Sequence, residues 1–196
     1  MTAPLKIRYV HAPAKILVMD METRSIGFHD AGRFGVKGSE PLCIALSWLD
    51  SPYEPWCWDL GSVPLETLLR LFKRAYDDAT HVMAHNIRRF DLPIINGSLM
   101  EHGMPMLGPK LTIDTLKDLK KIAGMSKSQQ NLAETFDLEE EKLPMSDAMW
   151  RRAGRLNPKA LERARQRCRT DVVQNKALYW KLREGEYLHP PKVWRP

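Results

Sequence analysis

The longest regular pattern in the sequence predicts a helix from Pro158 to Arg183. Asn157 stands at the position of an N-cap and a proline follows it, and both residue types favour the start of a helix. One face carries a mostly apolar stripe at helical spacing: Leu161, Ala164, Cys168, Val172, Asn175, Tyr179 and Leu182. A helix of this length buries such a stripe only against a second layer, so the rest of the chain must supply a sheet or further helices.

Three segments nearer the N-terminus have the composition of β-strands. KILVMD, at residues 15–20, is a short apolar run and is typical of a buried strand. Residues 41–49 and 53–59 follow, joined by a short turn at residues 50–52. These three segments predict an antiparallel meander.

Helices and strands alternate in the middle of the chain. The elements that we expect there are a helix at 62–76, a strand at 81–85, a helix at 91–103, an edge strand at 111–114 and short helices at 115–122 and 129–136. A run of strands followed by alternating elements predicts an α/β fold in which helices flank a mixed sheet.

The chain has 196 residues and a hydrophobic content of 43%, enough for one compact domain with a sizeable core. We expect an N-terminal extension at 1–13, a single domain at 14–184 and a proline-bearing tail at 185–196. Because no signal-peptide or transmembrane pattern is recognisable, we expect a cytoplasmic protein without a membrane partner.

The charged residues and the cysteines narrow the classes of partner and site. Lys and Arg outnumber Asp and Glu by 30 to 24, and the net charge of +6 suits a polyanionic partner such as nucleic acid. The three cysteines are an odd number without CxxC spacing, so they indicate neither a disulfide framework nor a cysteine zinc site.

Four acidic residues are the candidates for chemistry. In VMDMET, the strand period of two places Asp20 and Glu22 on one face, where two carboxylates repel each other unless a cation such as magnesium compensates them. Asp91 stands where a strand gives way to a helix, and Asp171 lies on the apolar side of the long helix. The alternatives are a solvated strand end for the first pair, a helix cap for Asp91, and an ion pair with an arginine for Asp171.

Three motifs resemble those of a known family. They are DMET at residues 20–23, AHNIRRFD at 84–91 and RQRCRTDVV at 165–173. In order and spacing they resemble the DEDD superfamily of 3′ to 5′ exonucleases, the DnaQ-like group with a ribonuclease H-like fold. The resemblance covers about residues 14–183, and small separate chains of this kind resemble exonucleases of bacteria and their phages.

The resemblance implies a two-metal phosphodiesterase. Two Mg²⁺ or Mn²⁺ ions would be bridged by Asp20, with Glu22 and Asp171 completing one site and Asp91 supporting the other. Such a pair, about 3.5 to 4 Å apart, activates water and stabilises the leaving oxygen. The implied substrate is the 3′ end of a single-stranded nucleic acid, with DNA favoured, and a polymerase or another replication protein is a candidate partner.

Other residues are candidates for holding the substrate. Thr23 would help to place the 3′ nucleotide or would serve as an ordinary strand-end residue. Asn86 would tie the turn before Asp91 through its side-chain amide or would be a plain turn residue. The loop from Gly27 to Ser39 is either a solvated hairpin or a clamp on the single strand, with three residues suited to stacking and binding phosphate: His29, Arg33 and Phe34.

The sequence departs from the family at one catalytic position. Members usually carry Tyr four positions, or His five positions, before the last Asp, where this chain has Arg167 and Gln166. Neither side chain can accept the proton of an attacking water. Arg167 would instead be a catalytic residue that grips phosphate, or a histidine (His85, His102 or His189) would fold into the base position. Otherwise the site is degenerate, and the chain is a weak or inactive nucleic-acid-binding or polymerase-accessory module.

Overall fold

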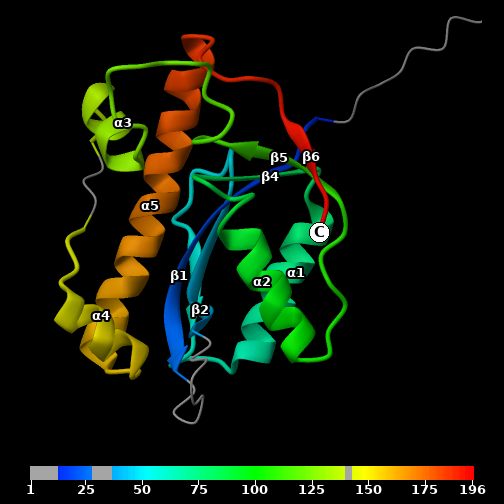
Figure 1. The fold of residues 1–196 in the computed structure, drawn as a ribbon, viewed down its shortest axis with the longest axis vertical. Helices are drawn as coiled ribbons and strands as arrows, with labels where there is room; N and C mark the ends of the chain where they lie inside the picture. The colour runs from blue at the N-terminus through cyan, green and yellow to red at the C-terminus, as the bar shows by residue number, and fades with distance from the viewer. Residues whose placement is uncertain (1–12, 28–36, 140–142) are drawn as a thin grey trace, which may run out of the picture.

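A computed structural model describes residues 13–27, 37–139 and 143–196. Its sheet has six strands in the order β3-β2-β1-β4-β5-β6 (Figure 1). The strands are β1 (Ile16–Gly27), β2 (Lys37–Trp48), β3 (Trp56–Asp59), β4 (His81–Ala84), β5 (Lys110–Asp114) and β6 (Lys192–Trp194). The pairs β1–β2, β2–β3 and β5–β6 are antiparallel, whereas β1–β4 and β4–β5 are parallel. The predicted mixed sheet, a meander followed by parallel strands, is therefore confirmed.

Five helices accompany the sheet in the described residues. They are α1 (Leu65–Asp78), α2 (Asp91–Glu101), α3 (Gln129–Thr135), α4 (Asp147–Gly154) and α5 (Pro158–Glu184). The Asn157 side chain accepts a hydrogen bond from the backbone N–H of Ala160, as the N-cap prediction required. None of these helices has the length and apolar character that crossing a membrane requires.

The sheet is buried on both faces, and β1 lies at its centre. Leu17 and Met19 point to one side and join the core formed with α1 and α2. Val18 points to the other side and packs with Cys168 and Val172 of α5. Figure 1 shows α1 and α2 on one side of the sheet and α5 along the other. The stripe predicted on the long helix is thus its contact with the sheet.

The region around β5 differs from the sequence prediction. Residues 111–114 are not an edge strand, because β6, from the segment expected to be a tail, pairs with β5 on its outer side. The helix expected at 115–122 is wrong, because residues 115–117 form a turn. The Asp114 side chain accepts hydrogen bonds from the N–H groups of Leu116 and Lys117 and holds this turn. Helix α4 was not predicted.

Candidate active site

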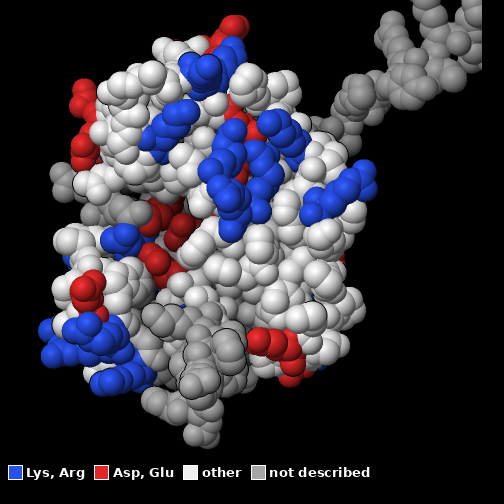
Figure 2. All heavy atoms as spheres, viewed as in Figure 1, with Lys and Arg blue, Asp and Glu red and all other residues white. Residues whose placement is uncertain are grey.

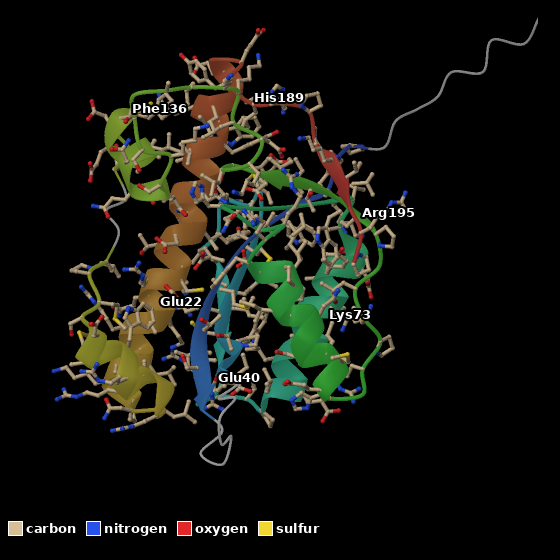
Figure 3. All side chains as sticks on the ribbon, viewed as in Figure 1. Glu22, Glu40, Lys73, Phe136, His189 and Arg195 are labelled. Carbon is tan, nitrogen blue, oxygen red and sulfur yellow. The ribbon has the colours of Figure 1, made fainter. Side chains whose placement is uncertain are left out.

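Three of the four candidate acidic residues converge at one point. Carboxylate oxygens of Asp20, Glu22 and Asp171 all lie within 4.8 Å of one another. Asp20 and Glu22 come from the α5 side of β1, just before a bulge at Thr23, and Asp171 comes from the middle of α5. Figure 2 shows acidic side chains inside a hollow of this face, at the place where Figure 3 labels Glu22 between β1 and α5.

Asp91 approaches the same cluster from the other side of β1. It is the first residue of α2 and is 3% exposed, so it is not the N-cap that the alternative reading required; Phe90 has that position. Burial raises the pKa of Asp91 to about 8, and the charges of Asp114 and Glu22 add to the rise.

Asp20 is affected by the charges of the other three carboxylates. Burial raises the pKa of its carboxyl well above the usual range, and the charges of Asp171, Glu22 and Asp91 raise it further. Its Oδ2 is buried and has no hydrogen-bond partner among the described residues. Asp20 and Glu22 are half-buried and Asp171 is buried, and carboxylates this close together repel one another and need protons or cations. An all-oxygen donor set of this kind fits Mg²⁺ or Mn²⁺.

The raised pKa of Asp91 predicts how the stability of the metal-free protein depends on pH. The folded pKa of about 8 lies above the ordinary value of 3.8, so stability is fully present below 3.8 and is lost as the pH rises through about 8. We expect Asp91→Asn to melt at a higher temperature than wild type in chelator at pH 8, and this advantage to shrink toward pH 4. Thermal melts at the two pH values measure it. A constant difference would contradict it, and Asp50→Asn, at an exposed turn, is the control.

Arg167 of α5 points into the acidic cluster from a position four residues before Asp171. Its Nε donates a hydrogen bond to Glu22 Oε1 at 3.0 Å and lies 3.9 Å from Asp171 Oδ2. The guanidinium also donates to the Leu143 carbonyl and lies 5.6 Å from the centre of the Trp150 ring. Gln166, in contrast, is exposed and bonds to Glu162. The Arg167 guanidinium therefore supplies a permanent positive charge within the acidic cluster.

His85 is the candidate histidine whose position fits the site. The parallel pairing of β1 with β4 ends at Val18 and Met83. The next residues on the same face of the sheet are therefore Asp20, after Val18, and His85, after Met83. His85 Nδ1 lies 3.0 Å from Thr115 Oγ1, which donates its own hydrogen to Asn175 Oδ1 at 2.9 Å. Because the Thr115 hydroxyl donates to Asn175, it must accept from His85. These two hydrogen bonds place the imidazole proton on Nδ1 and leave Nε2 as the acceptor nitrogen.

The other two histidines lie elsewhere. His102 follows α2, so about 15 Å of helix separates it from Asp91 at the opposite end. His189 is exposed, and Figure 3 labels it near the top of the view, well away from Glu22. Neither residue occupies the base position.

Asn86 organises the turn before α2 through its main chain. Its φ of 71° lies in the left-handed region, which Asn tolerates better than most residues. Its carbonyl accepts from the N–H groups of Arg89 and Phe90, both at 3.1 Å. Its side-chain Oδ1 is buried without a hydrogen-bond partner in the described part of the chain. Of the two roles expected for Asn86, a tie through the side-chain amide or a plain turn residue, the hydrogen bonds of the main chain fit the second.

A buried ion network that the sequence analysis missed supports this turn. Arg88 donates to both carboxylate oxygens of Asp118, and Asp114 accepts the N–H groups of Asn86 and Arg88. Both aspartates are fully buried, and Lys192 of β6 lies 3.8 Å from Asp118. The network fixes the turn that delivers Asp91. The only local signal was a pair of aspartates four residues apart after a strand.

The remaining candidates for substrate binding are placed only in part. Thr23 follows the bulge in β1 and is half-buried. The other three candidates, in the loop between β1 and β2, lie outside the described residues: His29, Arg33 and Phe34.

Comparison with known proteins identifies the fold class. No protein-family model matches the sequence, and no curated protein matches it. The structure is similar to a family B DNA polymerase from the hyperthermophilic archaeon Pyrobaculum calidifontis, with a TM-score of 0.60 and 15% identity. The fold is ribonuclease H-like α/β. The match covers 87% of this chain and 25% of the polymerase, so this ribonuclease H-like chain corresponds to about a quarter of the larger protein.

Proposed function

We propose that this chain is a metal-dependent 3′ to 5′ exonuclease of the DEDD type. The observation that carries the proposal is the convergence of Asp20, Glu22 and Asp171 within 4.8 Å, with buried Asp91 close enough to raise the pKa of Asp20. The likeness to part of a DNA polymerase and the net charge of +6 support DNA as the substrate.

Four carboxylates hold the metals in this proposal. Asp20, Glu22 and Asp171 would hold one Mg²⁺ or Mn²⁺ ion, and Asp20 together with Asp91 would hold a second. When bound, such ions would supply Lewis acidity toward the attacking water and toward the leaving 3′ oxygen. His85 accepts the proton of that water at Nε2, and its hydrogen bond to Thr115 keeps the ring in the required tautomer.

The surroundings of the carboxylates suit a single-stranded end. The proposed contacts to the terminal nucleotide are Asn86 Oδ1 and Thr23, which directly follows Glu22 in β1. Phe90 is 41% exposed directly before Asp91 and offers a ring for base stacking. Figure 2 shows basic side chains gathered on the surface next to the acidic hollow. Such a surface attracts the phosphates of the strand.

End-labelled oligonucleotides test the proposal directly. With Mg²⁺ or Mn²⁺, a 5′-labelled single strand of DNA is expected to give a ladder that shortens from its 3′ end, and excess chelator is expected to stop the reaction. A matched RNA strand measures the preference for DNA. Cleavage of circular single strands at the same rate would indicate an endonuclease, and full activity in chelator would contradict the metal-dependent mechanism.

A second candidate function follows from Arg167. Because its guanidinium already pairs with Glu22, the carboxylates have a resident counter-ion, which suits a binding module that retains the fold without catalysis. Such a module would bind single strands with salt-dependent affinity and would release no nucleotide with either metal in a single-turnover assay. The same oligonucleotides therefore separate the two functions.

A further inference from the structure

All three cysteines of the chain meet behind the acidic cluster. Cys43 comes from β2, Cys57 from β3 and Cys168 from α5, and their sulfur atoms all lie within 4.8 Å of one another. Their sequence spacing gave no indication of a site, because pairing of the two strands and packing of the helix bring them together.

The backbone places the three thiols on one face of the sheet. In the β2–β3 ladder, Cys43 pairs with Asp59 and Ala45 pairs with Cys57, so both cysteines point to the side that α5 covers. Cys168 faces them from the buried stripe of α5. Sulfurs that share one tetrahedral zinc at about 2.3 Å lie about 3.8 Å apart. The thiols therefore need to move by no more than about 1 Å to share an ion.

The surroundings of the thiols favour a bound cation over simple packing. Cys43 and Cys168 are fully buried, whereas Cys57 is half-buried and leaves one side of the cluster open to an entering ion and a solvent ligand. The positive charge of Arg169 acts on Cys57. Arg169 also offsets the negative charge that three thiolates retain around a divalent ion.

We propose that Cys43, Cys57 and Cys168 bind one soft d¹⁰ metal ion, Zn²⁺ or Cu⁺. Each thiol gives its proton to solvent, and three sulfur–metal bonds form without oxidation or reduction. Thiolates select these ions, whereas the carboxylates select hard ions such as Mg²⁺, so the two sites do not compete. Cys168 Sγ lies 3.2 Å from the Asp20 carbonyl oxygen, so the ion would link β2, β3 and α5 directly behind the strand that carries Asp20.

Cadmium is a suitable probe, because its bonds to thiolates absorb in the ultraviolet and its bonds to carboxylates do not. The reduced, metal-free protein is titrated anaerobically with Cd²⁺, and the absorption is expected to saturate at one equivalent and to be accompanied by a higher melting temperature. Displacement of Cd²⁺ by Zn²⁺ and by Cu⁺, in separate arms, identifies the preferred ion. The absence of a thiolate band at one equivalent would overturn the proposal.

Single substitutions locate the ligands. Cys57→Ser is expected to weaken Cd²⁺ binding by more than about 100-fold, because loss of a ligand exceeds the 10- to 100-fold effect of an outer partner. This half-buried position tolerates serine, so the test stands even if Cys43→Ala or Cys168→Ala fails to fold. Glu22→Gln removes a carboxylate and is expected to leave the thiolate band unchanged. An unaltered affinity in folded Cys57→Ser would overturn the site, whatever the outcome of the nuclease assays.

Discussion

Asp20→Asn is expected to reduce single-turnover release of 3′ nucleotides by more than about 10⁴-fold, which exceeds the usual contribution of a general base. The charges of Asp171, Glu22 and Asp91 all act on Asp20, which is the residue that the proposal assigns to both metal positions. Neutralising it removes the bridging ligand that a two-metal mechanism requires. The rate is measured with saturating enzyme and a 5′-labelled single strand.

The rate loss in His85→Gln is the comparison for the rate loss in Asp20→Asn. Glutamine keeps a polar group at the position but accepts no proton, so we expect a loss of about 10²- to 10⁴-fold, within the range for a general base. Asp50→Asn, at an exposed turn, is the control for a change of charge and is expected to retain the wild-type rate. An Asp20→Asn enzyme with a rate near wild type would exclude the proposed role of this residue.

Thermal melts in chelator separate a catalytic loss from unfolding. Burial and the charges of three neighbouring carboxylates raise the pKa of Asp20, so neutralising this residue removes a desolvation cost and relieves repulsion. The variant is therefore expected to melt no lower than wild type. A large drop in melting temperature would make Asp20 a structural ion-pair partner instead.

The sequence predicted best those elements that are determined by nearby residues. Helix α5 was expected at 158–183 and spans Pro158–Glu184, because the Asn157 cap and the apolar stripe are both local signals. The turn at 115–117 was mistaken for a helix because the contact that fixes it, from the Asp114 carboxylate to two backbone N–H groups, competes with helical hydrogen bonds. Strand β6 was missed because Lys192–Trp194 is short and becomes a strand only through pairing with β5.

In the candidate site, too, the sequence predicted the features that local motifs encode and missed those that depend on distant contacts. Motif order predicted that Asp20, Glu22 and Asp171 would come together, and the structure brings their oxygens within 4.8 Å. Their catalytic roles stay predictions. The pairing of Arg88 with Asp118 joins residues 30 positions apart, and it depends on the adjacency of β4 and β5, which no local pattern encodes. The hydrophobic period of a segment does not specify which distant segment lies beside it, so such long-range contacts could not be predicted from the sequence pattern.

Arg167→Ala is expected to bind Mn²⁺ about 10- to 100-fold more tightly than wild type. The Arg167 guanidinium donates to Glu22 at 3.0 Å and lies 3.9 Å from Asp171, so it occupies two of the carboxylates that a metal ion needs. A hydrogen bond between charged groups contributes about 1.5 to 3 kcal/mol, which corresponds to the expected change in affinity. Electron paramagnetic resonance of free Mn²⁺ measures binding independently of catalysis.

Arg163→Gln is the matched control for this prediction. It removes one positive charge from the same helix, one turn before Arg167. We expect it to leave the affinity for Mn²⁺ within about twofold of wild type, because Arg167 pairs with Glu22 and Asp171 whereas Arg163 forms no ion pair with them in the described residues. Arg167→Tyr is expected to bind Mn²⁺ as tightly as Arg167→Ala and to react faster than wild type at limiting metal, because Glu22 is then available to the ion. An unchanged or weaker affinity in folded Arg167→Ala would mean that the guanidinium does not compete with the metal. If that variant also loses its rate at saturating metal, Arg167 contacts the phosphate of the substrate instead.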